Sequence, residues 1–313
     1  MATICVLGGS GFVGRQVCAA LAARGFRLRV PTRSREGAKH LTMLPTCETI
    51  AADVHDPASL KALISDCDAV VNLVGVLHNG RGNASFENAH TNLAKKVISA
   101  CREVGVRRVL HMSALNAAVD GASGYLRSKG AAETLMRDSG LDVTIFRPSV
   151  IFGREDMFLN MFARLLKSAP ALIVPMGNTR LQPVHVADVA QAFAEAYVRR
   201  ESIGQTYDLV GARVWTMREL GQFVADAMGS NKPVFGADVT LSNIMAFAME
   251  CLPGKMMSVD NVRSMNKDCV SAGATFPFGI TPQSVEAIAP GYVAQASPRG
   301  RYAIYRDRTR RLG

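Results

Sequence analysis

Several features are missing from this sequence, and each absence excludes a class of protein. It contains no apolar run of about 18 residues, so we expect no membrane-spanning helix. Its first residues lack a basic stretch and a cleavage site, so we expect no signal peptide. Internal repeats and low-complexity linkers are also missing. With 48% hydrophobic and 20% charged residues, the 313-residue chain has the composition of a folded protein rather than a disordered one.

Paired cysteines are missing as well. The chain has seven cysteines, which is an odd number, and none forms a CxxC pair or clusters with histidines. Several of them fall in apolar stretches, where reduced thiols pack as small hydrophobic groups. We therefore predict a cytoplasmic protein with reduced cysteines and no metal site.

What the sequence does have is a glycine-rich turn between a strand and a helix. The strand is predicted over residues 3–7, and the helix continues to about Gly25. In this context the first glycine permits a tight turn, the second admits a pyrophosphate and the third lets the helix pack on the strand. The helix N-terminus then offers backbone N–H groups to phosphate. We predict that a dinucleotide binds to Gly8, Gly9, Ser10, Gly11, Phe12, Val13 and Gly14.

The region after the second strand indicates which dinucleotide. That strand is predicted over residues 26–30, and an NAD-binding protein usually carries an acidic residue at its end. This chain instead has Arg33 and, one turn later, Lys39. Guanidinium groups suit a 2′-phosphate, so we favour NADP(H) over NAD(H). The alternative is that these cations are simply solvated in a loop.

Strands and helices alternate along the first half of the chain, and two of the helices are predicted over residues 57–64 and 86–104. This order predicts an α/β fold with a doubly wound parallel sheet (Rossmann) over residues 1–153, with return segments near 180–211. A smaller C-terminal α+β lobe is expected over 154–296 and a basic tail over 297–313. Ligands of such sheets lie at the carboxyl ends of the strands, so Asp53, Val74 and Gly75 are expected near the cofactor.

A YxxxK pattern follows the fifth predicted strand. Tyr125 and Lys129 are four residues apart on a predicted helix, so they share one face. A neighbouring ammonium lowers the pKa of a phenol, which makes tyrosine usable as an acid or base. The preceding strand ends at Ser113. Because the pattern follows that strand, it indicates a catalytic role more specifically than it would alone.

These motifs together resemble the extended short-chain dehydrogenase/reductase superfamily. Within it, several stretches are similar to an atypical branch that contains the nucleotide-binding accessory subunit of respiratory complex I and its bacterial relatives. The stretches are residues 72–77, the Phe86 and His90 pair, residues 112–115 and residues 146–153.

The resemblance implies roles for particular residues. It places Gly8, Gly11 and Gly14 on phosphate, Arg33 on the 2′-phosphate and Asp53 near adenine. It places Tyr125 and Lys129 on the ribose side and Pro148 and Ser149 beside the nicotinamide.

The resemblance leaves the reaction open. Active members usually carry a second hydroxyl just after Ser113, where this chain has Ala114 and Leu115. One hypothesis is an NADP(H)-binding accessory or assembly protein of respiratory complex I or a quinone-related membrane system. The alternative is an active NAD(P)-dependent oxidoreductase or epimerase acting on a small carbonyl or quinone-related substrate, with Tyr125, Lys129 and Ser113 as its catalytic groups.

The net charge and one apolar helix indicate what kind of partner the chain contacts. The formal net charge is +10, and the last residues are rich in arginine. A segment near 242–252 is apolar almost all round, which is typical of buried core but also fits a membrane contact. Our hypothesis is peripheral contact with an anionic surface on the inner face of the cytoplasmic membrane. We expect no nucleic-acid partner, and we interpret His78 and His90 as hydrogen-bonded surface groups.

Overall fold

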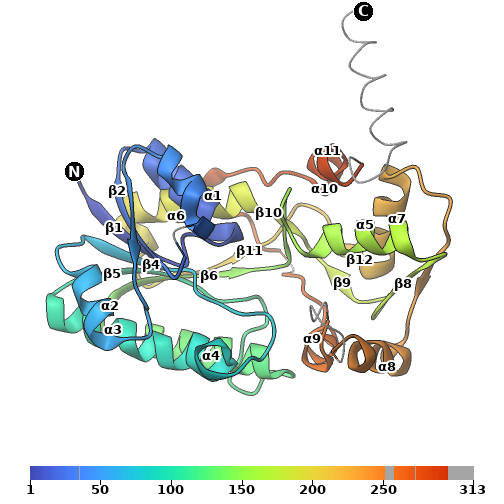
Figure 1. Ribbon diagram of the computed structural model, residues 1–313, viewed down its shortest axis with the longest axis horizontal. Helices are drawn as coiled ribbons and strands as arrows, with labels where there is room; N and C mark the ends of the chain where they lie inside the picture. The colour runs from blue at the N-terminus through green and yellow to red at the C-terminus, as the bar shows by residue number, and fades with distance from the viewer. Residues whose placement is uncertain (35, 251–256, 272, 295–313) are drawn as a thin grey trace, which may run out of the picture. The chain divides into compact units, whose positions relative to one another are not determined.

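The computed structural model describes residues 1–34, 36–250, 257–271 and 273–294. Contacts divide the chain into two compact units. The first unit comprises residues 1–148, 186–209 and 274–281, and the second comprises 149–185, 210–273 and 282–313. Figure 1 labels most of the elements of both units.

The first unit is built on a seven-stranded sheet in the order β11-β6-β5-β4-β1-β2-β3. Every neighbouring pair in it is parallel. The central strand β4 is buried along its whole length, as a strand covered on both faces must be. The predicted doubly wound parallel sheet is therefore confirmed. Its strands are β1 (Thr3–Leu7), β2 (Arg27–Thr32), β3 (Cys47–Ala51), β4 (Ala69–Asn72), β5 (Arg108–Met112), β6 (Asp142–Pro148) and β11 (Thr206–Leu209).

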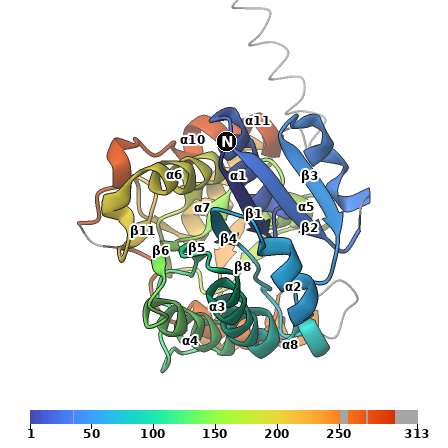
Figure 2. The same cartoon turned by 90° about the vertical axis from the view of Figure 1, so that its left-hand side faces the viewer.

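Helices cover both faces of this sheet (Figures 1 and 2). One face carries α1 (Phe12–Ala23) and α6 (Val186–Val198); the other carries α2 (Pro57–Ile64), α3 (Leu93–Val104) and α4 (Gly124–Arg137). Each helix buries an apolar stripe at three- and four-residue spacing. In α3 that stripe packs against the sheet strands in one hydrophobic core and includes Leu93, Ala94, Val97, Ile98 and Cys101.

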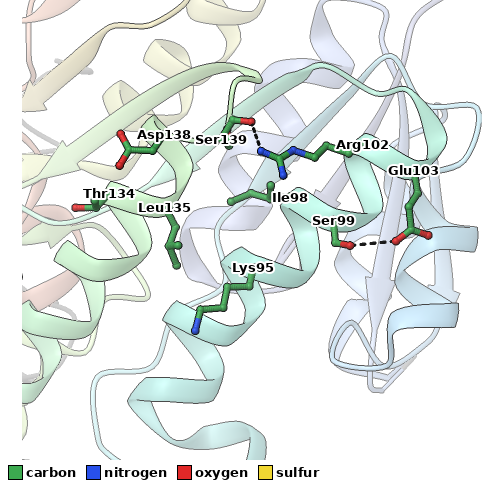
Figure 3. Close-up of a pocket in the computed structure, with 9 residues that line it drawn as sticks. All are labelled: Lys95, Ile98, Ser99, Arg102, Glu103, Thr134, Leu135, Asp138 and Ser139. Carbon is green, nitrogen blue, oxygen red and sulfur yellow. Dashed lines mark hydrogen bonds between the residues drawn. The ribbon is translucent and has the colours of Figure 1, made fainter.

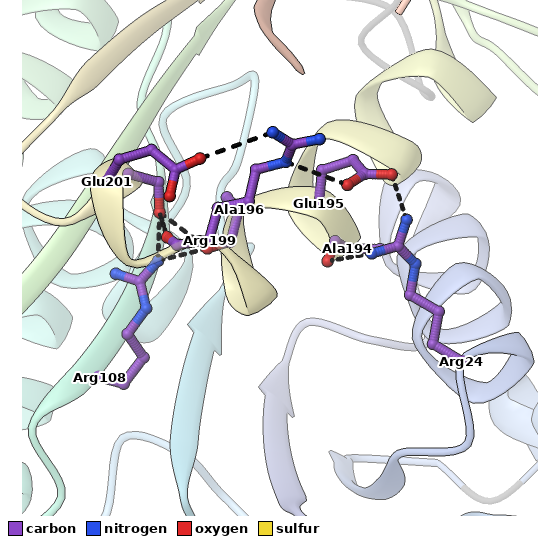
Figure 4. A network of polar contacts seen from close by, with 8 residues as sticks. Arg24, Arg108, Ala194, Glu195, Ala196, Arg199 and Glu201 are labelled. Atoms are coloured by element: carbon purple, nitrogen blue, oxygen red, sulfur yellow. Dashed lines mark hydrogen bonds and ion pairs between the residues drawn. The ribbon is translucent and has the colours of Figure 1, made fainter. Parts of the chain in front are cut away.

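Arginine side chains tie α1 and β5 to α6 (Figure 4). Arg24 at the end of α1 donates to the carbonyl of Ala194 at 2.9 Å and pairs with Glu195. Arg108 of β5 donates to the carbonyl of Ala196 at 2.8 Å. Both bonds reach carbonyls in the last two turns of α6, so they hold that helix against α1 and β5.

The second unit combines short two-stranded sheets with helices. Its strands pair as β7 with β10, β8 with β13 and β9 with β12. The expected smaller α+β lobe is thus observed. Its elements are β7 (Ile151–Phe152), α5 (Phe158–Ser168), β8 (Leu172–Val174), β9 (Arg180–Leu181), β10 (Val184–His185), β12 (Trp215–Thr216), α7 (Met217–Ala227), β13 (Val234–Gly236), α8 (Val239–Glu250), α9 (Val259–Ser264), α10 (Val285–Ile288) and α11 (Pro290–Val293). Across the part of the chain that the structure describes, no helix has the length and apolarity needed to cross a bilayer.

Three expectations need correction. Strand β2 continues to Thr32 instead of ending at residue 30; Pro31 is tolerated because β1 pairs with β2 only as far as Arg29. The helix expected over 86–104 begins as a π-helical turn, Glu87–Asn92, before α3. Helix α8 is not buried core: only Ser242 and Ala246 among its residues are buried. The predicted basic tail, residues 297–313, lies outside the described residues.

Candidate dinucleotide-binding site

The glycine turn adopts the geometry that close approach of a phosphate requires. Gly8 has a φ of +81°, and its carbonyl accepts a hydrogen bond from the N–H of Gly11 at 3.1 Å. A Cβ on Gly14 would lie 2.2 Å from the carbonyl oxygen of Gly8, so only glycine fits there. Helix α1 then starts without a side-chain cap at Gly11 and without an acidic residue in its first turn. These features fit a pyrophosphate at the helix N-terminus.

The other residues predicted to bind the dinucleotide belong to the same turn. Ser10, Phe12 and Val13 are half-buried, Gly11 is exposed, and Gly9 is buried against Val30 of β2. The turn therefore presents backbone on its outer side and packs on the sheet with its inner side.

Arg33 and Asp53 follow the ends of the neighbouring strands β2 and β3. Arg33 is exposed just beyond β2, and Asp53 follows β3, where its carboxylate accepts the N–H of His55 at 2.9 Å. Burial lowers the pKa of His55, and the charges of Lys96 and Arg33 lower it further while Asp53 opposes them. Both predicted residues therefore surround His55. Lys39, in contrast, pairs with Glu36 at 2.7 Å on an exposed turn.

The segment after β4 joins the glycine turn to helix α4. A Cβ on Gly8 would lie 3.1 Å from the backbone nitrogen of Val74. A Cβ on Gly75 would lie 3.1 Å from Nζ of Lys129. Val74 and Gly75 thus lie between the glycine turn and helix α4.

Helix α4 carries Tyr125 and Lys129 one turn apart. Ser123 caps the helix by accepting the N–H of Leu126 at 3.1 Å, which fixes its start. Lys129 is only 2% exposed, and its ammonium donates to the carbonyl of Met112 at 3.0 Å. Burial lowers the pKa of Lys129 to about 8. The lysine is thus held at the end of β5, while Tyr125 is half-buried one turn before it.

Ser113 is drawn into a buried ionic network that sequence reasoning missed. Its hydroxyl donates to Glu133 at 2.7 Å, and Glu133 also accepts from Nε of Arg147 at 3.0 Å and pairs with Arg137. The side chain of Glu133 is 3% exposed. One sequence signal was available: Lys129 and Glu133 are four residues apart on α4, so the carboxylate lies on the YxxxK face.

His90 is buried, which corrects the expectation of a surface group. It is 2% exposed; Nε2 accepts from the N–H of Val76 at 3.1 Å, and Nδ1 lies 2.8 Å from Oγ of Ser128. Its ring also packs against those of Phe86 and Tyr125. These partners satisfy the imidazole away from water.

The contacts of Pro148 and Ser149 relate these two residues less directly to the predicted cofactor. Pro148 is the last residue of β6, and its carbonyl accepts the N–H of Leu115 at 2.9 Å. Ser149 belongs to the second unit, where its hydroxyl donates to the carbonyl of Cys269 at 3.0 Å.

A groove of about 420 Å³ lies between the outer sides of α3 and α4 (Figure 3). Lys95, Arg102 and Asp138 are among the residues that line it, and none of the predicted site residues does. We locate the site at the glycine turn instead, because a phosphate needs backbone N–H groups and close approach, which the turn provides.

Comparison with known proteins agrees with this geometry. A family model described as NAD(P)H-binding matches residues 8–157, and one described as an RmlD substrate binding domain matches residues 114–255. The solved structure of the dTDP-glucose 4,6-dehydratase DesIV from Streptomyces venezuelae has the same fold: the TM-score is 0.71 at 19% identity, and 93% of this chain and 95% of that chain are covered.

The chain belongs to the extended short-chain dehydrogenase/reductase superfamily and carries its nicotinamide-dinucleotide-binding domain. Within that superfamily it is similar to mitochondrial NADH dehydrogenase (ubiquinone) 1 alpha subcomplex subunit 9 of Arabidopsis thaliana. The two are 35% identical over 228 residues, which is 71% of this chain and 56% of the relative. It is also 28% identical to the ceramide reductase of Caulobacter vibrioides over 64% of this chain and 62% of that protein. The match thus spans less than two thirds of either relative.

Proposed function

We propose that this chain holds NADP(H) as a resident nucleotide and serves as an accessory or assembly protein of respiratory complex I or a quinone-related membrane system. The similarity to the complex I subunit supports the partner. The bond from Ser113 to Glu133 carries the accessory role, because it commits the hydroxyl at the end of β5 to an internal carboxylate. Ala114 and Leu115, which follow, are buried and have no hydroxyl to polarise a substrate carbonyl.

The test is to purify the chain and identify the nucleotide that copurifies, with its stoichiometry and exchange rate. We expect NADP(H) at full occupancy, slow exchange, and no NADPH oxidation with carbonyl compounds or quinones. Rapid exchange together with substrate-dependent oxidation would contradict the accessory role.

Arg33 is our proposed ligand of the 2′-phosphate. It is exposed and has no hydrogen bond or ion pair within the described part of the chain, whereas Lys39 is paired with Glu36. Arg33→Ala should weaken NADP⁺ binding by about tenfold or more, since a charge-assisted bond is lost, and leave NAD⁺ binding unchanged. Lys39→Ala is the matched control and should change neither. Equal loss of NADP⁺ and NAD⁺ binding in Arg33→Ala would remove the 2′-phosphate assignment.

A second candidate is an active NADP-dependent reductase, which the buried Lys129 beside Tyr125 favours. The bound nucleotide would supply a hydride to a carbonyl carbon, and Tyr125 would give its hydroxyl proton to the carbonyl oxygen. Lys129, with its lowered pKa, would hold the ribose and ease that proton loss. Tyr125→Phe should then abolish oxidation of NADPH while leaving nucleotide affinity nearly intact.

We further propose that the chain works at the inner face of the cytoplasmic membrane. A net charge of +10 favours an anionic surface, and α8 exposes Leu241, Ile244 and Phe247. Sedimentation with anionic vesicles should pellet the chain, and neutral vesicles should not. A variant ending at Ser297 should pellet less; equal pelleting would remove the arginine tail from this proposal.

A further inference from the structure

The segment Leu73–Val76 is held at two ends. At the first end it touches the glycine turn, since a Cβ on Gly8 would lie 3.1 Å from the Leu73 carbonyl carbon. At the other end Gly75 faces two side chains: a Cβ there would lie 3.1 Å from Nζ of Lys129 and 3.5 Å from Nε2 of His90. A dinucleotide that runs from the turn toward Lys129 must therefore pass along this segment.

The hydrogen bonds of His90 run in one direction. The N–H of Val76 donates to Nε2 of His90, so the ring proton must sit on Nδ1. Nδ1–H then donates to Oγ of Ser128 at 2.8 Å, and the Ser128 hydroxyl donates to the carbonyl of Tyr125 at 2.9 Å. The chain of bonds connects the end of the segment to the first turn of α4.

This arrangement requires a neutral imidazole. A proton on Nε2 would face the N–H of Val76, donor against donor. Burial, together with the neighbouring Lys129 and His111, lowers the pKa of His90 to about 2. His90 therefore moves no proton at ordinary pH, and its contribution is to hold backbone in place.

We propose that His90 is a positioning residue that fixes Gly75 and Val76 against α4 and thereby shapes the nicotinamide-ribose half of the site. The inference rests on the proposed dinucleotide function. It gives a role to a buried histidine that belongs neither to the glycine turn nor to the residue predicted to bind the 2′-phosphate, Arg33.

The experiment compares two ligands on the full chain: NADP⁺, and adenosine 2′,5′-bisphosphate, which lacks the nicotinamide half. His90→Phe keeps the ring and loses both hydrogen bonds. It should weaken NADP⁺ binding by about tenfold, because the segment is released, and change binding of the fragment by less than about twofold. His90→Gln, whose amide oxygen reaches Val76, should recover most of the affinity for NADP⁺.

Ser128→Ala provides a milder variant in case His90→Phe does not fold. It removes the acceptor of Nδ1–H but keeps the bond to Val76, and we expect about threefold weaker NADP⁺ binding with the fragment unaffected.

The outcomes separate the two proposals. Wild-type protein that binds neither ligand overturns the dinucleotide function itself. Wild-type protein that binds both, with variants that lose both equally or lose neither, overturns the role of His90 and leaves the dinucleotide function standing.

Discussion

Two buried carboxylates, one in each unit, are held in opposite ways. Burial raises the pKa of Glu133 in the first unit, but hydrogen bonds from Arg147 and Ser113 outweigh it and hold that pKa below its usual value. Within the described residues, Asp156 of the second unit accepts from neutral donors alone, among them the N–H of Leu159 at 2.7 Å and the hydroxyl of Tyr292 at 2.8 Å. There burial prevails, and the pKa of Asp156 is raised.

The two units also differ in how apolar side chains are distributed over their surfaces. In the second unit Ile173 and Phe235 are direct partners across β8 and β13, and both are exposed. Leu241, Ile244 and Phe247 are exposed at three-residue intervals along α8. Exposed apolar side chains occur in the first unit as well, for example Met43, Leu77 and Val119, but in the second unit they gather along one helix and one strand pair, as in a contact surface.

The largest expected effect comes from removing the internal charge. Breaking a fully buried pair costs about 3–5 kcal/mol, and Glu133→Gln should cost about 2 kcal/mol, since Arg147 and Arg137 keep 31% and 49% exposure. Hydrogen exchange of β5 and β6 amides should report this loss in the first unit. Fluorescence of Trp215, the single tryptophan, reports the second unit and should shift less.

Glu103→Gln is the matched control, since Glu103 pairs with Lys61 at 3.0 Å with both side chains about half exposed. It should leave the stability of the first unit nearly unchanged, because the pair is exposed to solvent. If Glu133→Gln is as mild as this control, the internal network does not stabilise the first unit.

Close packing of the glycine turn gives the next effect. Gly14→Ala places a Cβ 2.2 Å from the Gly8 carbonyl oxygen, so backbone must shift at a cost of about 1–3 kcal/mol. Dinucleotide affinity should fall by more than about tenfold, because the phosphate contacts move with the turn. Gly37→Ala, whose nearest neighbour would be 4.0 Å away, should leave both properties unchanged. Titration of bound NADPH fluorescence measures the difference.

Two buried histidines should make the first unit sensitive to mild acid. Burial lowers the pKa of His90 to about 2 and of His111 to about 3, against 6.5 for the exposed ring. The unfolded chain therefore takes up protons first as the pH falls, and stability present above pH 6.5 is lost below it. The free energy of unfolding should fall by about 1.4 kcal/mol per pH unit for each histidine.

His90→Gln should halve that slope between pH 6 and pH 5, as measured by amide exchange in β4 and β5. An unchanged slope would mean that His90 is solvated or charged in the folded protein. The loss of the Glu133 contribution belongs to a lower window, below the usual carboxyl value of 4.5.

Local patterns were sufficient to predict the sheet and the glycine turn. Helix α2 has the bounds that its sequence predicts, Pro57–Ile64, because Asp56 caps it and Pro57 opens it. The roles of His90 and Glu133 were not predictable in this way. Their partners Val76, Ser128 and Arg147 come from a loop, a helix and a strand that are distant in the sequence, so burial of these polar groups depends on tertiary contacts.

The prediction that helix α8 is buried was wrong for a different physical reason. Its apolar residues surround the helix almost evenly, and such a pattern normally indicates burial on all sides. The second unit offers it a small cluster on one side only, formed with Met257 and Val262. The pattern predicted the helix correctly but not how much of it the rest of the unit covers.

The smallest effect on stability should come from that uncovered face. Phe247 is 67% exposed, so Phe247→Ser should change the stability of the second unit by less than about 0.5 kcal/mol, whereas truncating the fully buried Phe162 should cost about 3–5 kcal/mol. Binding to anionic vesicles should nevertheless weaken by about threefold or more, since an apolar ring is lost from the contact. If Phe247→Ser pellets as fully as wild type, α8 is not the contact with lipid, and its exposed face then fits a protein partner. A loss of stability comparable to that of the Phe162 variant would instead mean that α8 is covered in solution, and the contrast between the two units would disappear.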